Sequence, residues 1–166
     1  MILLQLKWEL MTNFKIDIDS TKAKRMFNNA SKAVSNPIPA FKEIRTYQLK
    51  QIQEAFKTSG KNIIGKPWKK LSPNYLKSKI KSGFLESILI RTGKMRSSFK
   101  SIKLNTKILS ITSVGVPYFK NHQQGKSGGT FKAKLPQRQI LGHSKAMIQR
   151  TMKIFIDFIN NSIKNG

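Results

Sequence analysis

The sequence has no cysteine and only seven acidic residues among its 166 positions. The lack of cysteine excludes disulfides, thiolate metal ligands and cysteine nucleophiles. The acidic residues are Glu9, Asp17, Asp19, Glu43, Glu54, Glu86 and Asp157, and none lies between positions 87 and 156. General acid–base pairs, divalent-metal sites and serine triads need carboxylates or suitable substitutes near the reacting group. We therefore expect no catalytic residue, no metal and no cofactor, and a protein that is not an enzyme.

Histidine is scarce as well, because the chain has only His122 and His143. Neither has a cysteine or a nearby acid that would complete a metal site. The simplest prediction is that His122 is a hydrogen-bonded structural residue and that His143 is exposed.

Long hydrophobic runs are missing. No stretch approaches the ~18 apolar residues of a membrane span, and the apolar start of the chain is interrupted by Lys7 and Glu9, which is not typical of a signal peptide. We expect no association with a membrane. At 18.9 kDa, with 39% hydrophobic residues, the chain can bury the core of a single domain.

Positive charge is abundant: 32 Lys and Arg residues give a net charge of +25. Such a charge attracts polyanions, which include DNA, RNA and acidic proteins. Only six of these residues are arginines, although arginine is favoured for bidentate phosphate contacts and for reading bases. A functional basic face and the lysine bias of an AT-rich genome both remain open. For a functional face, the candidate polyanion contacts are Lys66, Lys69, Lys70, Lys77, Lys79 and Lys81.

Periodicity and capping signals predict helices over 20–34, 40–58, 72–81 and 144–161, with Pro37 and Pro39 as a hinge between the first two. Alternation over 101–116 predicts a hairpin that turns at residues 105–107, and residues 130–136 are typical of an edge strand. In the last helix one apolar stripe is expected to close the core: Ile148, Met152, Phe155, Ile156, Ile159 and Ile163. The fold class is therefore α+β, a single domain with N-terminal helices and a long C-terminal helix packed on a small, mainly antiparallel sheet.

Four segments, in order, resemble one family. "PWKKLSPNYLKSK" (67–79) is similar to its tryptophan–leucine–lysine element, and "ILIRTGKMRSSF" (88–99) to its apolar–Thr–Gly element. "VGVPYFKNHQQG" (114–125) is similar to its glycine, aromatic and His-Gln-x-Gly signature, and "LPQRQILGHS" (135–144) to its Pro-x-Arg-x-aromatic-Leu-Gly-x-Ser close. The chain thereby resembles the virion morphogenesis, or tail completion, family of tailed bacteriophages and Mu-like prophages.

This resemblance implies a structural protein that completes the tail or joins it to the head at the neck, as a homo-oligomeric ring. Its expected partners are other copies of itself, neighbouring neck, connector or tail-tube proteins, and packaged DNA as a further option. It would be made in the bacterial host cytoplasm and reside in the virion. Residues 1–40 would form an N-terminal extension that includes the first helix, and one option is that this part becomes ordered only on assembly. Residues 41–166 would form the tail-completion-like domain.

The resemblance also implies a rigid structural corner. We expect Tyr118 to be buried, His122 and Gln123 to hold backbone by hydrogen bonds, Gly125 to permit the turn, and Pro136 with Arg138 to fix a second loop. For Arg138 the alternative is a solvated surface residue. The full set of motif residues is Trp68, Thr92, Gly93, Gly115, Tyr118, His122, Gln123, Gly125, Pro136, Arg138 and Gly142.

Two other functional classes are weighed against this one. A non-specific nucleic-acid-binding protein would also need the lysines, and aromatics among lysines could stack on unpaired bases. A phage lysis or nuclease enzyme is disfavoured by the scarcity of carboxylates.

Overall fold

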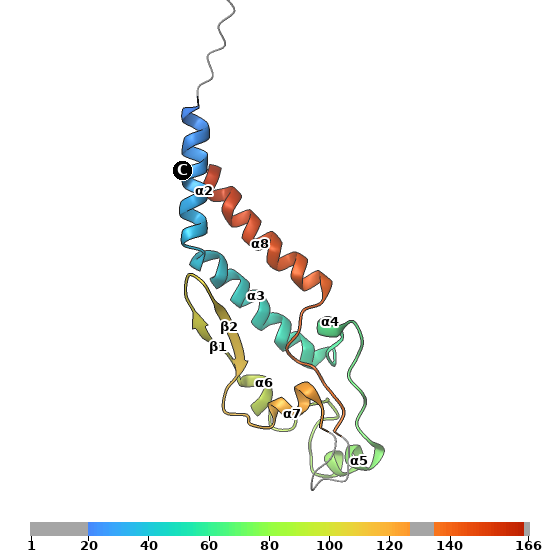
Figure 1. Cartoon of the computed structure of the whole chain (residues 1–166). Helices are drawn as coiled ribbons and strands as arrows, with labels where there is room; N and C mark the ends of the chain where they lie inside the picture. Colours follow the sequence, from blue (N-terminus) through green and yellow to red (C-terminus); the bar gives the residue numbers. More distant parts are fainter. Residues whose placement is uncertain (1–19, 127–134, 165–166) are drawn as a thin grey trace, which may run out of the picture.

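Three long helices run along the molecule (Figure 1): α2 (Thr21–Ser35), α3 (Ile38–Lys57) and α8 (Lys145–Lys164). The computed structural model describes residues 20–126 and 135–164. Helix α8 packs against α2 and α3, and the other side of α3 contacts the two strands. The α+β class predicted from the sequence is confirmed.

The predicted hinge separates α2 from α3. The amide of Asn36 closes α2 on the carbonyl of Lys32 at 3.1 Å, and Pro37 precedes the first turn of α3. Pro39 does not end a helix but lies inside the first turn of α3. A proline is tolerated there because first-turn amides have no partner within the helix. Helix α3 therefore begins two residues earlier than predicted.

Four short helices carry the chain around the lower end of Figure 1: α4 (Lys61–Ile64), α5 (Pro73–Lys81), α6 (Lys94–Ser97) and α7 (Phe119–Gln124). Helix α5 begins as predicted, with Ser72 in an extended conformation and Pro73 at the first helical position. Helix α4 lies before α5, where no helix was predicted, and α7 forms part of the predicted rigid corner at residues 118–125.

The strands form an antiparallel hairpin, β1 (Phe99–Leu104) and β2 (Leu109–Ser113), as predicted. Its turn is closed by Asn105, whose Oδ1 accepts hydrogen bonds from the amides of Lys107 and Ile108, both at 2.9 Å. An asparagine side chain commonly closes a turn in this way. The register shifts between Ser101 and Lys103.

The core lies where α3, the hairpin and the segment before α8 meet. A chain of aromatic contacts crosses it, from Trp68 to Phe56 at 5.9 Å between ring centroids, then to Phe99 at 6.1 Å, and then to Phe119 at 5.5 Å. Its buried residues are Ile52, Ala55, Phe56, Ile63, Trp68, Met95, Phe99, Val116, Ile140 and Met147.

The predicted core stripe of α8 is wrong in part. Ile148, Met152 and Ile156 are 47%, 57% and 51% exposed. The side chains that α8 buries are instead Met147 and Ile154, and between them Thr151 accepts a hydrogen bond from Gln48 Nε2 at 3.0 Å. The inner face thus contains a polar residue, which is why an apolar stripe did not identify it.

Two predictions concern residues outside the described part of the chain. Most of the predicted edge strand at 130–136 falls there, although Leu135 forms an antiparallel bridge with Lys126. Residues 1–19 fall there too, and the division of the chain at residue 40 stays a prediction.

Candidate functional site

The side chain of Gln123 joins α7 to the segment before α8. Its Oε1 accepts hydrogen bonds from the amides of Ile140 at 2.8 Å and Leu141 at 3.0 Å, and its Nε2 donates to the carbonyl of Leu141 at 2.6 Å. One amide therefore satisfies three backbone groups of a segment seventeen residues away. This confirms the predicted role of Gln123 in holding backbone.

Backbone contacts strengthen the same junction. The amide of Arg138 donates to the carbonyl of His122 at 2.7 Å. Gly125 turns the chain with φ 75° and ψ 164°, a conformation that is essentially restricted to glycine. A Cβ at this position would lie 3.1 Å from the amide nitrogen of Gln137. Gly125 is required both by conformation and by space.

Arg138 is an anchor rather than a surface residue, because only 5% of it is exposed. Its Nε donates to the carbonyl of Lys69 at 3.2 Å and its Nη2 lies 3.5 Å from the carbonyl of Lys70. Burial lowers the pKa of the guanidinium, although an arginine remains charged in proteins. The alternative of a solvated Arg138 is wrong.

Trp68 connects the loop before α5 to the same segment. Its Nε1 donates to the carbonyl of Gln139 at 2.8 Å, and its indole ring lies against Gly60, where a Cβ would overlap the ring. The side chain is 3% exposed. Gln123 and Trp68 thus bind the segment 138–141 from outside, and Arg138 anchors the same segment to the loop at Lys69 and Lys70.

Tyr118 corrects a prediction. It is 43% exposed, whereas the neighbouring Phe119 reaches the core and contacts Phe99 edge-on. Consecutive residues at a helix start point about 100° apart, so only one of two adjacent aromatics can face the interior. The Tyr118 ring packs edge-on against His122, with 6.2 Å between centroids.

His122 also departs from its predicted role. Its carbonyl anchors Arg138, but the buried Nδ1 of its ring has no hydrogen-bond partner among the residues that the structure describes. Burial lowers the pKa of His122 below its ordinary value of 6.5, and the nearby charge of Arg138 lowers it further. The second histidine, His143, is exposed as predicted.

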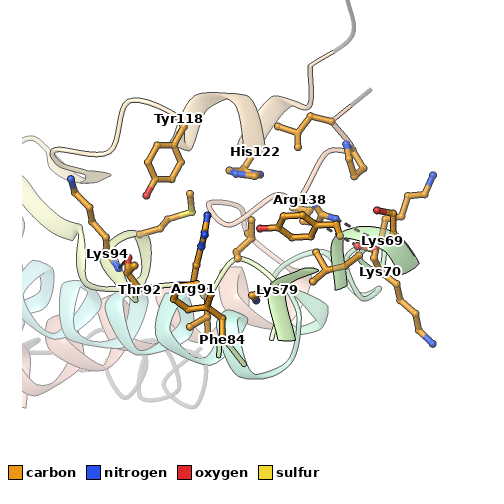
Figure 2. Close-up of a pocket in the computed structure, with 18 of the residues that line it drawn as sticks. Lys69, Lys70, Lys79, Phe84, Arg91, Thr92, Lys94, Tyr118, His122 and Arg138 are labelled. Atoms are coloured by element: carbon orange, nitrogen blue, oxygen red, sulfur yellow. Dashed lines mark hydrogen bonds between the residues drawn. The ribbon is translucent and has the colours of Figure 1, made fainter. Parts of the chain in front are cut away.

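A cavity of about 1200 Å³ lies beside the corner (Figure 2). It is lined by residues from the loop at 69–73, from α5, from the stretch 84–95, and by Tyr118, His122 and Arg138. In Figure 2 the guanidinium of Arg91 extends from the lower loop toward the segment that carries Tyr118 and His122. Its Cζ lies 4.7 Å from the centroid of the Phe84 ring.

Of the lysines predicted to contact polyanions, Lys66, Lys69, Lys70, Lys77 and Lys81 are exposed. Lys79 differs, because it is 5% exposed and its Nζ donates to the carbonyl of Ser87 at 2.6 Å. Burial lowers its pKa, and the charge of Arg91 lowers it further. Neither Arg91 nor Phe84 was predicted as a site residue, although Arg91 lies within the motif segment 88–99.

The remaining motif residues lie at turns around this site. Gly93 and Gly115 both have positive φ angles, and Gly93 precedes α6. Thr92 and Pro136 line the cavity. Gly142 is packed closely, since a Cβ there would lie 2.7 Å from Gln139 Nε2. The structure therefore places Gly115 away from the cavity and gathers most of the others around it.

The described residues offer little for metal or membrane chemistry. Within residues 20–126 and 135–164, no three His, Asp or Glu side chains come together as metal ligands. No helix in the same part of the chain is long and apolar enough to cross a bilayer.

Comparison with known proteins gives one family. The model of the phage virion morphogenesis family matches residues 18–160. No curated protein matches the chain, and no solved structure matches it. The family is one of structural morphogenesis proteins and is not known as an enzyme family. With nearly all of the described helices and both strands inside the matched range, the chain belongs to the phage virion morphogenesis family.

Proposed function

We propose that this phage morphogenesis protein completes the tail, or joins it to the head at the neck, as a ring of identical copies. Membership of the family supports a structural role in the virion. In a ring, each copy would use a rigid block of loops to hold its neighbours in the particle.

The junction at residues 138–141 is the observation that carries this proposal. Gln123 and Trp68 bind backbone groups of residues 139–141, and Arg138 binds the carbonyls of Lys69 and Lys70, so that three side chains tie two separate segments together. No Asp or Glu is among the described residues that line the cavity beside the junction, so these residues offer no pair of acids for catalysis there. Such an arrangement favours a scaffold that holds loops in place over a site that transforms a substrate.

Deletion of the gene tests the assignment. We expect filled heads and separate tails, or tails with defective upper ends, in lysates viewed by electron microscopy. Supplying the protein in trans should restore particles. Normal infectious particles from the deletion mutant would refute the proposal.

The exposed lysines support a second candidate, a non-specific nucleic-acid-binding protein. Lysines that neutralise phosphates release counterions, so binding would weaken steeply with salt. Five exposed residues can be replaced together by glutamine: Lys66, Lys69, Lys70, Lys77 and Lys81. Assembly and DNA binding are then measured separately.

If assembly fails while DNA binding by the purified variant is unchanged, the lysines face a protein. If duplex binding is lost while particles still form, and the wild-type protein is absent from virions, the second candidate replaces the first. A matched control replaces five exposed lysines elsewhere: Lys22, Lys32, Lys100, Lys107 and Lys153.

A further inference from the structure

The cavity beside the corner is lined by cations without acids. Its charged side chains are Lys69, Lys70, Lys79, Arg91, Lys94 and Arg138, and no Asp or Glu is among the described residues that line it. The ion pairs within the described part of the chain, Lys57–Glu54 and Lys153–Asp157, lie elsewhere. The cavity therefore carries a concentrated positive charge that the described residues do not neutralise.

Two of these cations are almost fully buried. Lys79 and Arg138 are each 5% exposed. Buried lysines and arginines are ordinarily paired with a carboxylate, since removing a charge from water costs free energy. Here Lys79 is close enough to Arg91 for the two positive charges to disfavour each other. An anion from outside would relieve this repulsion.

The buried cations also have N–H groups that are not used in the hydrogen bonds seen among the described residues. The ammonium of Lys79 carries three N–H groups and uses one on the carbonyl of Ser87. Arg138 carries five and uses two on the carbonyls of Lys69 and Lys70. The buried Nδ1 of His122 has no partner among the described residues. Polar groups held in this way can receive the oxygens of a ligand without rearrangement.

The rest of the lining is apolar and aromatic, with Leu71, Tyr75, Phe84, Leu89 and Met95 between the cations. At about 1200 Å³ the cavity exceeds the ~300–1,000 Å³ typical of sites for drug-sized molecules. Both features suit a polypeptide segment in which an acidic side chain lies between apolar ones.

A DNA duplex does not fit this site. Its phosphates lie on a wide, stiff cylinder, which can touch the exposed lysines but cannot bring a phosphate to groups as buried as Lys79 and Arg138. A flexible single strand is the stronger competitor, because Tyr75 and Tyr118 are exposed and could stack on bases.

We propose that this cavity binds an Asp or Glu carboxylate on an acidic, apolar segment of a partner protein, with Lys79 and Arg91 as the cations that recognise it. This deepens the proposed joining function by naming the chemistry of the partner. It also assigns Lys79 a role distinct from that of the exposed lysines around it.

The test uses the full chain and a fluorescein-labelled peptide, Gly-Leu-Asp-Leu-Asp-Leu-Gly. A control peptide carries Asn in place of both Asp residues. Fluorescence anisotropy should show at least tenfold tighter binding of the Asp peptide, since a buried charged hydrogen bond is worth at least ~1.4 kcal/mol, or a factor of ten.

Lys79→Met should abolish this preference while filling the same space with an apolar chain. Lys107→Met removes the same charge from the exposed hairpin turn and should keep the preference within about twofold. Arg91→Gln provides a second variant, and because Arg91 is exposed its replacement leaves no cavity in the core. This variant should bind the Asp peptide severalfold more weakly and should bind the Asn peptide as the wild type does.

Equal binding of the two peptides would overturn the proposal, as would an equal effect of Lys79→Met and Lys107→Met. Tighter binding of a labelled single-stranded oligothymidine, lost in Lys79→Met, would assign the cavity to nucleic acid instead. If peptide binding fails while deletion of the gene still leaves unjoined heads and tails, only this site assignment falls and the proposed function stands.

Discussion

At the scale of single residues, one glutamine crosslinks two segments of the chain through hydrogen bonds. Gln123 bonds three backbone groups of Ile140 and Leu141, and Ile140 is fully buried. Without Gln123 these groups would lose partners in a region that excludes water.

Gln123→Ala should therefore lower the free energy of unfolding by about 3 kcal/mol, at roughly 1 kcal/mol for each lost bond. Gln124→Ala is the matched control, because Gln124 is the exposed next residue and should change stability by less than about 0.5 kcal/mol. Urea denaturation followed by tryptophan fluorescence measures both. Similar losses in the two variants would show that the hydrogen bonds of Gln123 contribute little.

A comparison of Gly125 with Gly65 distinguishes the cost of a steric clash from the cost of a positive φ angle. Both have positive φ, but a Cβ on Gly65 would meet open space, whereas a Cβ on Gly125 would press on Gln137. We expect Gly65→Ala to cost about 1 kcal/mol and Gly125→Ala about 3 kcal/mol. Thermal unfolding of the two variants checks the order, and equal melting temperatures would contradict it.

His122 makes stability depend on pH. Because its pKa is lowered in the folded chain, the unfolded chain binds more protons below pH 6.5, and the free energy of unfolding falls as the pH drops through this range. Well above pH 6.5 both states carry a neutral ring and the effect vanishes.

His122→Gln should remove this loss, so that the variant gains stability relative to the wild type between pH 8 and pH 5. His143→Gln, at an exposed position, should follow the wild type. Chemical denaturation at the two pH values gives the comparison. A constant difference between His122→Gln and wild type across the range would exclude a contribution from this ring.

The residue-level outcome shows what a motif can predict. Gln123, Gly125 and Arg138 have the roles that the family resemblance implied. The positive φ of Gly125 is local, whereas the backbone partners of Gln123 and Arg138 lie 17 and 69 residues away along the chain. The prediction of a buried Tyr118 is wrong, and the sequence did not distinguish the buried Lys79 from the exposed lysines around it. Their exposure depends on which neighbour reaches the core, and that is settled by contacts with Phe99 and Ser87 far along the chain or across a loop.

At the scale of elements, α8 has two apolar faces and buries only one. Periodicity predicted the bounds of the helix to within a few residues and its start at Ser144. The Oγ of Ser144 accepts a hydrogen bond from the amide of Met147 at 3.3 Å. It did not identify the inner face, since the buried face includes Thr151 while the exposed one reads as continuous Ile and Met. Helix positions followed from local patterns, whereas helix orientation required the partner α3.

Two methionines on this helix test the orientation. Met147 is 2% exposed and Met152 is 57% exposed. Met147→Ala should destabilise by about 2–5 kcal/mol through loss of buried volume, and Met152→Ala by less than about 0.5 kcal/mol. Denaturation midpoints decide between them, and a larger loss at Met152 would mean that α8 is rotated.

At the scale of the whole molecule, positively charged residues are spread along the sequence but differ in how exposed they are. Most lysines are exposed and could be replaced singly at little cost. Among the cations whose positions the structure describes, only Lys79 and Arg138 combine a positive charge with burial, and composition alone could not separate them from the others. The net charge of +25 left a functional basic face and a lysine bias of composition both open, and the fold was needed to show where positive groups are held fixed.

The bond between Trp68 and Gln139 also bears on how the chain is made. A ribosome delivers the tryptophan long before its carbonyl partner, and Ile140, Met147 and Ile154 follow later still. Until those residues have left the ribosome, the nascent polypeptide would expose hydrophobic surface that they cover in the folded protein, a condition that favours chaperone binding. This core would therefore be completed only after residues 139–154 have been synthesised.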